Sequence, residues 1–257
     1  MRSFLSCEGR PISRVSITQG FNDYFDIRLA NTPALKQTSY QIRHQVYCEE
    51  LGWEPETGDK VEMDPYDEHS LPLLLYHKAS KTYAGTMRLV IPPTDEPDRP
   101  LPFEALYGTS LHKNVIDPAT VSRSSIGEIS RLCVPGSFRR RAGEKNKPFV
   151  LNDMSGLDLQ SAEDQRNFPK ISVGLYIGVI ALTKLLDLPH IFVVTEPRLM
   201  RRLQWLGIPT ERAGDDIEHR GTRALFYLDR DYVLENLKPE MMALLTLLEG
   251  QLTEQIR

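Results

Sequence analysis

Five short apolar stretches, each bounded by turn residues, are predicted to be β-strands. They cover residues 71–77, 83–91, 126–134, 190–195 and 222–228. The first two are joined by a polar run, which predicts an antiparallel hairpin. The stretch 190–195 is apolar and rich in β-branched residues, which is typical of a strand buried on both faces.

Apolar residues at helical spacing predict four helices. They cover residues 35–51, 171–186, 198–206 and 232 onward. The second is the most hydrophobic part of the chain, yet Lys184 and Asp187 leave an uncharged span shorter than the roughly 20 residues that cross a bilayer. We therefore expect no transmembrane segment. This helix should lie buried across a sheet, where Gly174 and Gly178 would allow close backbone approach.

The order of these elements predicts an α/β fold of the α+β type, with one mixed central sheet flanked by helices. A single domain is expected over residues 35–230, with a polar, basic insertion at 137–168. Residues 1–34 show no clear periodicity and are expected to form an N-terminal leader or lid, and residues 231–257 a C-terminal helix. A doubly wound fold is not favoured, because no Gly-x-Gly-x-x-Gly or Walker sequence occurs.

The composition is ordinary for a soluble globular protein. Of 257 residues, 40% are hydrophobic and 26% are charged, with a formal net charge of -4. Residues 1–14 hold no apolar run long enough for a signal peptide. Cys7, Cys48 and Cys133 lack metal-ligand spacing, so we expect reduced thiols, a cytoplasmic location and no metal site.

The strand expected over 126–134 carries charges among apolar residues. Alternation places Glu128 and Ser130 on one face and Ile129 and Arg131 on the other, unless a bulge resets the register. These charges need partners, because an unpaired buried charge is costly. The candidate partners in other ordered segments are Arg43, Asp64, Asp67 and Arg88.

The spacing of these polar residues resembles that of the acyl-homoserine-lactone synthases. The motifs are Arg43-x-x-Val46-Tyr47, Leu51-Gly52-Trp53, Glu62-x-Asp64-x-x-Asp67, Arg88-Leu89 and Glu128-x-Ser130-Arg131. They resemble more closely the N-acyl amino acid synthases and the acyltransferases that accompany exosortase (PEP-CTERM) systems. These groups belong to the GNAT superfamily, so the resemblance, which spans about residues 40–228, implies a GNAT-like domain with a splayed central sheet.

The resemblance implies an N-acyltransferase. Such an enzyme would move a fatty acyl group from the thioester of an acyl carrier protein, or of coenzyme A, to the amine of an amino acid or similar small amine. The acyl-phosphopantetheine thioester would be a co-substrate, and no tightly bound cofactor is expected. Two alternatives stay open: an acyl-homoserine-lactone synthase that uses S-adenosylmethionine, and a non-catalytic module that binds acyl carrier protein or lipid. The autoinducer synthases usually carry Phe where Tyr47 stands, and they are shorter. The leader, the basic insertion and the C-terminal helix of this chain disfavour the first alternative.

Acyl transfer to an amine needs a positioned thioester, a base and donors for the developing oxyanion. By resemblance, the strand 126–134 faces the thioester with its backbone at Leu132, Cys133 and Val134, and Glu128, Ser130 and Arg131 are the catalytic candidates. Glu128 could accept the amine proton through water, since apolar neighbours raise the pKa of a carboxyl group. The structural alternative is an ion pair between Glu128 and Arg131 or Arg88.

A second group of residues suits recognition of a small zwitterion. Its members are Arg43, Tyr47, Trp53, Asp64, Asp67 and Arg88. The guanidinium of Arg43 would bind a carboxylate, and the carboxylates of Asp64 and Asp67 an ammonium group. Arg88 is expected to hold Asp64 or Asp67 in place. The alternative is a solvated acidic loop. The apolar residues expected to line an acyl pocket are Phe103, Leu106, Ile180 and Trp205.

A basic cluster follows the strand 126–134. Its members are Arg139, Arg140, Arg141, Lys145 and Lys147. It could steer an acidic acyl carrier protein into place, or it could be a solvated loop. Nucleic acid is not an expected partner, because the cluster lacks interleaved aromatic residues. Residues 139–143 match the GNAT pyrophosphate loop only in part, which favours a carrier protein over free coenzyme A as the donor.

Overall fold

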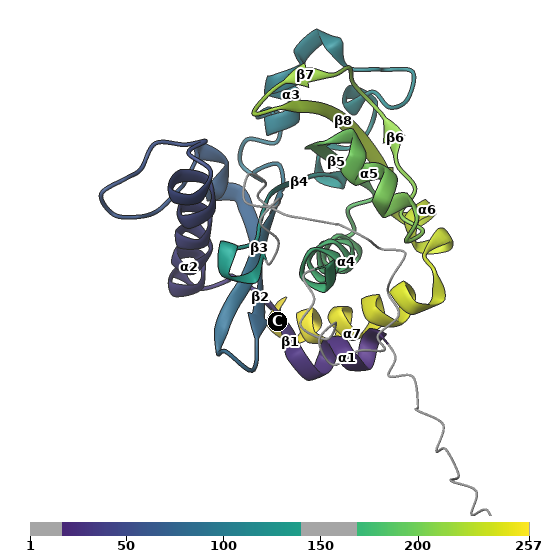
Figure 1. The fold of residues 1–257 in the computed structure, drawn as a ribbon. Coiled ribbons are helices and arrows are strands. Elements are labelled where there is room, and N and C mark those ends of the chain that lie inside the picture. Colours follow the sequence, from purple (N-terminus) through teal and green to yellow (C-terminus); the bar gives the residue numbers. More distant parts are fainter. Residues whose placement is uncertain (1–16, 140–168, 257) are drawn as a thin grey trace, which may run out of the picture.

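The computed structural model describes residues 17–139 and 169–256 (Figure 1). The described residues form one open, eight-stranded mixed sheet flanked by helices. The strands are β1 (Phe25–Leu29), β2 (Ser70–His77), β3 (Thr82–Val90), β4 (Ile126–Cys133), β5 (His190–Thr195), β6 (Glu211–Arg212), β7 (Ile217–Glu218) and β8 (Thr222–Asp229). The expected fold class is confirmed, and each of the five expected strands is present.

The sheet is antiparallel except at its centre. Its order is β1-β2-β3-β4-β5-β8-β6, with β7 paired to β8, and only β4 and β5 run parallel. The hairpin of β2 and β3 has the expected antiparallel pairing. The short strands β6 and β7 have two residues each, which is too few for a period-2 pattern to reveal them.

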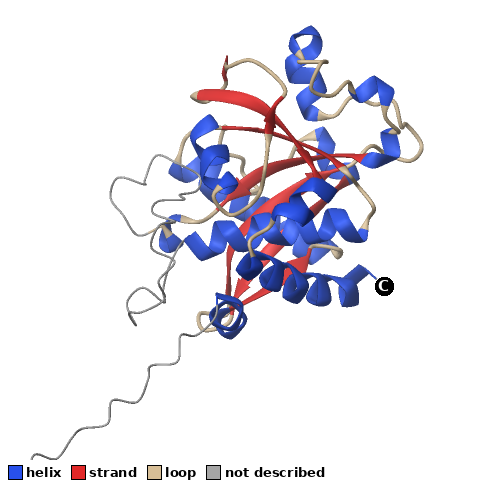
Figure 2. Ribbon diagram, turned by 90° about the vertical axis from the view of Figure 1, so that its right-hand side faces the viewer, coloured by secondary structure: helices blue, strands red, loops and turns tan. Residues whose placement is uncertain are grey.

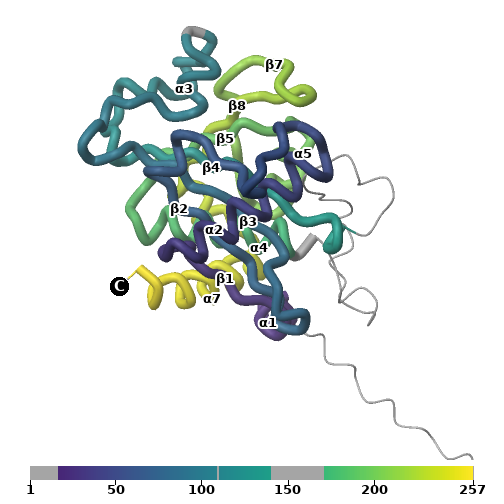
Figure 3. Tube along the Cα trace, turned by 90° about the vertical axis from the view of Figure 1, so that its left-hand side faces the viewer, coloured from purple at the N-terminus to yellow at the C-terminus, as the bar shows by residue number. Residues whose placement is uncertain are grey.

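Helices cover both faces of the sheet. They are α1 (Ile17–Tyr24), α2 (Pro33–His44), α3 (Pro102–Tyr107), α4 (Pro169–Leu185), α5 (Pro197–Gln204), α6 (Arg230–Asn236) and α7 (Pro239–Ile256). The main core lies between the sheet and α4 and α7, which cross in front of the strands in Figure 2. The opposite face, turned to the viewer in Figure 3, is covered by α2.

Helix α2 begins and ends where its sequence directs. Thr32 caps its first turn by accepting a hydrogen bond from the backbone N–H of Leu35, and Pro33 occupies a position that needs no donor. The expected helix of residues 35–51 continues past α2 as a π-helical turn, Gln45–Glu50. Gly52 then takes a φ of 62°, which glycine adopts without strain.

Residues 17–29 differ from the expected leader, because they form α1 and the edge strand β1. Phe21 and Ile27 are buried in the main core. Glycines on α4 make room for them: a Cβ atom at Gly174 would lie 2.4 Å from the Phe21 ring, and one at Gly178 would lie 2.2 Å from Cδ1 of Ile27. Side chains, and not the neighbouring backbone that we expected, therefore fill the space that these glycines leave on α4. Residues 1–16 lie outside the described residues.

The long helix α4 is buried, as expected. None of the helices in the described ranges is both long and apolar enough to span a membrane. The expected C-terminal helix is divided into α6 and α7, because Pro239 cannot donate the hydrogen bond that would continue α6 and starts a new helix instead. The described residues omit 140–168, which include most of the expected insertion.

Two irregularities in β4 create the site. Its pairing with β5 ends at Ile129 and Val193, although both strands continue beyond that point. Opposite β3, Arg88 pairs with Ser130 but Thr86 pairs with Cys133, so β4 carries one extra residue. Arg131 lies in this bulge with a φ of 54°. The two central strands therefore diverge, as expected of a splayed sheet.

Candidate active site

A pocket of about 400 Å³ opens where β4 and β5 diverge. The diverging strands supply Glu128–Leu132 of β4 and Val193–Thr195 of β5. The other lining residues come from the surrounding helices, loops and strands: Tyr47, Trp53, Asp64, Tyr66, Arg88, Pro102, Ala105, Leu106, Tyr176, His219, Arg220 and Arg223. Eight of the candidate residues named from sequence thus lie around one cavity: Tyr47, Trp53, Asp64, Arg88, Glu128, Ser130, Arg131 and Leu132. Segments far apart in the chain meet here.

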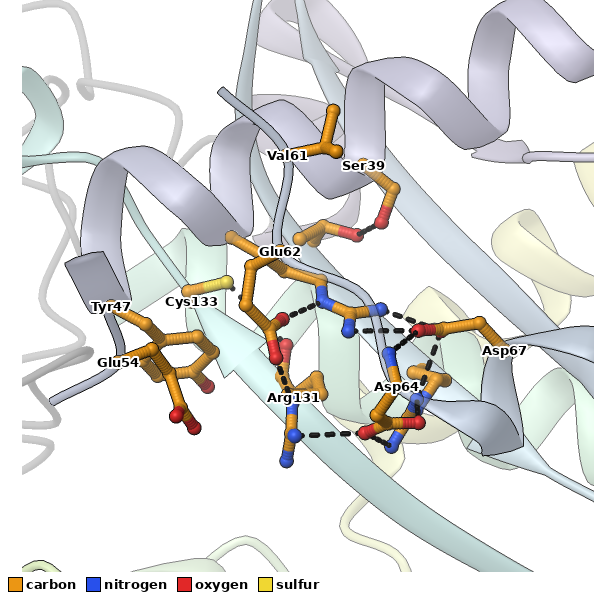
Figure 4. A network of polar contacts seen from close by, with 12 residues as sticks. Ser39, Tyr47, Glu54, Val61, Glu62, Asp64, Asp67, Arg131 and Cys133 are labelled. Carbon is orange, nitrogen blue, oxygen red and sulfur yellow. Dashed lines mark hydrogen bonds and ion pairs between the residues drawn. The ribbon is translucent and has the colours of Figure 1, made fainter. Parts of the chain in front are cut away.

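Arg43 does not reach this pocket. Its side chain is fully buried, with Nε 2.5 Å from Oε2 of Glu62 and with two hydrogen bonds, of 2.6 and 2.9 Å, to the carboxylate of Asp67 (Figure 4). Burial opposes its charge, but these carboxylates raise the pKa of Arg43 above its ordinary value. The guanidinium that we expected to bind a substrate carboxylate is saturated by protein groups, since helix α2 aims it inward at the acidic loop.

Asp67 is also buried and supports the loop from within. Burial alone would raise the pKa of Asp67, but the hydrogen bonds and charge of Arg43 and the charge of Arg88 lower it to about 2. Its Oδ2 accepts the backbone N–H of Asp64, which closes a capping box on the turn Pro65–His69. Asp67 therefore holds the loop and does not line the pocket.

Arg88 holds Asp64, as expected. Its Nη1 and Nη2 donate to the two oxygens of Asp64 at 2.7 and 3.0 Å, and Nη1 also donates to Asp67 at 2.8 Å. Its Nε donates to the hydroxyl of Ser130 at 3.1 Å. Burial opposes ionisation of Asp64, but the hydrogen bonds from Arg88 and the charge of Arg131 lower its pKa overall. Asp64 therefore presents an ionised carboxylate at the pocket wall.

Arg131 is turned into the pocket by the bulge in β4. Its Nη2 donates to Asp64 at 2.8 Å and its Nε to Glu62 at 3.2 Å, so it bridges the two carboxylates (Figure 4). Glu62 thus lies between Arg43 and Arg131 and joins the buried and the pocket-facing parts of one network. With this reset register, Arg131 lines the same cavity as Glu128.

Glu128 is the most perturbed carboxyl group of the pocket. Its side chain is only 2% exposed, and its Oε2 accepts the backbone N–H of Phe103 at 2.7 Å. Burial raises the pKa of Glu128 to about 8, although the Phe103 N–H and the charges of Arg88 and Arg131 act in the opposite direction. Among the described residues no ion pair within 4.0 Å joins Glu128 to Arg88 or Arg131. The ion pair that was the alternative to a catalytic role for Glu128 is therefore not formed.

Aromatic side chains form the wall beside Arg131. Tyr47 stacks on Trp53 with ring centroids 5.9 Å apart, and the Arg131 guanidinium lies 5.9 Å from the Tyr47 ring. The Tyr47 hydroxyl donates to the carbonyl oxygen of Leu132 at 3.1 Å. Burial raises the pKa of Tyr47 well above its ordinary value, so this donor stays protonated and fixes the strand where it diverges from β5.

The basic wall near β8 was not found from sequence. It consists of His219, Arg220 and Arg223, which come from the short β7–β8 turn and the start of β8. Arg220 forms an ion pair with Glu54, and the Arg223 guanidinium lies 5.8 Å from the Trp53 ring. In the sequence, Arg220 and Arg223 lie on either side of Gly221 and Thr222. Nothing in that pattern connects them with residues 43–131.

Several expected pocket residues lie elsewhere. Leu106 lines the pocket, but Phe103 is buried against Phe192 with ring centroids 4.1 Å apart, and Ile180 borders a separate small cavity. Trp205 follows the last residue of α5 and is 63% exposed, so it lines no acyl pocket in this structure. These residues were selected for being apolar, a property that does not reveal which side of an element faces the site.

The remaining candidates belong to the interior or lie outside the description. Cys133 and Val134 are buried and do not line the pocket. Burial raises the pKa of Cys133 to about 12, so its thiol is not a nucleophile at neutral pH. Arg139 is largely buried and pairs with Glu50. Arg140, Arg141, Lys145 and Lys147 lie outside the described residues.

Comparisons with known proteins agree with this fold. Residues 42–146 match the family model of the acetyltransferase (GNAT) domain. No curated protein matches the chain by sequence. Solved structures with the same fold include the acyl-homoserine-lactone synthase LasI (TM-score 0.56, 12% identity, covering 83% of this chain and 96% of LasI).

Two further solved structures are similar. The CoA-dependent acyl-homoserine-lactone synthase MesI has a TM-score of 0.55 and 18% identity, and the match covers 88% of this chain and 95% of MesI. FeeM, an N-acyl amino acid synthase from uncultured soil microbes, has a TM-score of 0.50 and 8% identity, with 83% and 94% covered. At these identities the structures establish the GNAT-like fold. The domain match and this fold together indicate an acyltransferase domain of the GNAT type over residues 42–146.

Proposed function

We propose that this protein is an N-acyltransferase that moves a fatty acyl group from an acyl carrier protein thioester to the amine of an amino acid or similar small amine. One observation carries the proposal. Glu128, with a pKa of about 8, lines the cavity at the point where β4 and β5 separate. A general base is most effective when its pKa lies near the operating pH.

The chemistry assigned to the site is aminolysis of a thioester. The phosphopantetheine arm enters between β4 and β5, whose pairing has ended there. Glu128 takes a proton from the ammonium group, directly or through one water molecule. The amine nitrogen then attacks the thioester carbonyl, a C–N bond forms and the C–S bond breaks. The leaving thiolate takes the second proton that the nitrogen loses, and Glu128 releases the first proton to solvent.

The charged network supports this chemistry by holding one wall rigid. Asp64 is fixed between Arg88 and Arg131 and is assigned to the ammonium group of the acceptor. Ser130 is held by Arg88 beside the divergence of the strands. Rotamers locked by several hydrogen bonds cost little entropy when a substrate arrives, so the wall is preorganised for the transition state.

A carrier protein is proposed as the donor because of the charges that follow β4. Arg139 is paired with Glu50, but Arg140, Arg141, Lys145 and Lys147 are suited by charge to an acidic carrier, and residues 139–143 supply only part of a pyrophosphate loop. Coenzyme A is the competing donor. The fold is shared with MesI, which is CoA-dependent, so both donors belong in the test. An association with exosortase systems remains a prediction from sequence.

The proposal is tested in cells and with purified protein. Lipid extracts of cells that express the chain should contain a new acylated amine, which is absent from cells that express Glu128→Gln at equal level. Purified protein should release thiol from acyl carrier thioesters only when an amine is present. Failure of both assays would exclude the proposal. Release of methylthioadenosine from S-adenosylmethionine would instead indicate a lactone synthase, and tight binding without turnover a binding module.

A further inference from the structure

Arg43 was expected to bind the carboxylate of an amino acid acceptor, but its side chain does not reach the pocket. It is buried and saturated by Glu62 and Asp67. Another residue must bind that carboxylate. Four arginines do line the pocket, namely Arg88, Arg131, Arg220 and Arg223. Arg88 and Arg131 are held by Asp64, and Arg131 also contacts Glu62.

Of the two arginines near β8, Arg223 is the less compensated. Arg220 forms a close ion pair with Glu54. The Nη1 atom of Arg223 lies 3.5 Å from Oε1 of Glu196, beyond the roughly 2.7–2.9 Å of a charge-assisted hydrogen bond. The same Nη1 atom donates a hydrogen bond to the backbone carbonyl of Thr222, at 3.1 Å. The side chain is 11% exposed, and burial lowers the pKa of Arg223.

The position of Arg223 suits a zwitterion. It lines the same cavity as Asp64 and Glu128, but it comes from β8, whereas Glu128 comes from β4. Its guanidinium lies 5.8 Å from the Trp53 ring, beside the aromatic wall. A carboxyl group assigned to the amine, Glu128, and a guanidinium suited to a carboxylate, Arg223, therefore border one cavity from different strands.

We propose that Arg223 binds the carboxylate of the acceptor, and hence that the acceptor is an amino acid or another small amine that carries a carboxylate. This inference rests on the proposed function and narrows its substrate class. A guanidinium in a partly buried site rejects acceptors that lack the carboxylate, because it then remains unpaired in a poorly hydrated position.

The first test compares acceptors in turnover. Amino acids are offered beside their amides, with acyl carrier and acyl-CoA donors, and products are identified by mass spectrometry. The amides should react at least tenfold more slowly. Arg223→Gln should raise the KM of the amino acid at least tenfold and leave the KM of the donor unchanged, and Arg223→Lys should restore part of the loss. Arg212→Gln, on the adjacent strand outside the pocket, is the matched control.

The outcomes separate the inference from the proposed function. Equal rates with amides, or products formed only from amines without a carboxylate, would overturn the assignment of Arg223 while supporting acyl transfer. A rise in the donor KM alone would show that Arg223 contacts the phosphate groups of the donor, which would also overturn it. An absence of any acylated amine would reject the proposed function.

The second test needs no turnover. In a Trp205→Phe background, Trp53 is the only tryptophan, and it lies beside Arg223. Its fluorescence should titrate with an amino acid that is an acceptor, at least tenfold more weakly with the corresponding amide, and at least tenfold more weakly after Arg223→Gln. If the turnover assay identifies no acceptor, a mixture of amino acids is titrated in place of the single amino acid. Equal affinity for acid and amide, or affinity that does not depend on Arg223, would overturn the inference even if no acylated product is detected.

Discussion

The backbone N–H of Phe103 donates a 2.7 Å hydrogen bond to Oε2 of Glu128. Phe103 is the second residue of α3, and N–H groups in the first turn of a helix have no partner within the helix. Glu128 therefore caps a helix that is distant in sequence, and this contact positions its carboxylate in the pocket. Burial still dominates and raises the pKa of Glu128 to about 8.

This pKa makes both activity and stability depend on pH. If Glu128 is the base, log kcat/KM should rise with unit slope up to about pH 8 and then level off. Because the folded-state pKa is raised above 4.5, the stability linked to Glu128 is fully present below pH 4.5 and is lost as pH rises through 8, at up to about 1.4 kcal/mol per pH unit. Glu128→Gln should lower kcat/KM about 100- to 10,000-fold and flatten both profiles. An unchanged pH profile of kcat/KM in the Gln variant would show that Glu128 does not take part in the proton transfer.

Arg131→Lys separates a role at the site from a structural role. Lysine keeps the charge but cannot bridge Glu62 and Asp64 with a planar guanidinium. We expect kcat/KM to fall by more than tenfold while the melting temperature changes by only a few degrees. Both are measured on one preparation. A fully active variant, or one that loses activity only in proportion to folded protein, would contradict this role.

The backbone at Arg131 predicts an unusual order of stabilities. Its φ is 54°, where an alanine pays about 1–2 kcal/mol and a glycine does not. Arg131→Gly should therefore be more stable than Arg131→Ala by about 1 kcal/mol in urea denaturation. At Ser130, the preceding strand residue, the ordinary order applies and Ala should be the more stable. If Ala is also the better residue at position 131, the bulge is not in solution as described.

Much of the fold could be predicted because its elements carry local signals. The strands β2, β3, β4, β5 and β8 and the helix α4 have apolar runs long enough to show their period. By contrast, α1 and β1 have eight and five residues, too few for a reliable pattern. Their burial depends on Gly174 and Gly178 of α4, a tertiary match that local patterns do not contain.

The candidate site was predictable in membership but not in geometry. Apart from Glu128, the charged residues of the motifs do gather in one network, because a buried strand forces Arg88 and Arg131 to find carboxylates. Which arginine faces the cavity is decided by packing. Arg43 points into the interior, and Arg223 reaches the cavity from β8, a strand late in the sequence.

Arg43→Gln tests the assignment of Arg43 to the interior. Removing this guanidinium leaves Glu62 with only Arg131 and Asp67 with only Arg88 as buried ion-pair partners, which should cost about 3–5 kcal/mol of unfolding free energy. Arg212→Gln, in an exposed pair with Asp216, should change stability by less than about 1 kcal/mol. Denaturant unfolding measures both. A stable Arg43→Gln protein with a raised KM for the acceptor would return Arg43 to the substrate site.

Gly178→Ala tests whether β1 is an integral part of the core. An added Cβ would lie 2.2 Å from Cδ1 of Ile27, so the variant should lose about 1–3 kcal/mol of stability through overpacking. Ile27→Val removes Cδ1 and alone should cost about 0.5–1.5 kcal/mol. In the double variant the alanine should add almost no further loss, since the clashing atom is gone. Gly250→Ala on α7, where nothing lies within 4 Å, should be stabilising by about 0.5–1 kcal/mol and controls for helix propensity. Strictly additive losses in the double variant would mean that Ile27 and Gly178 do not meet in the folded protein.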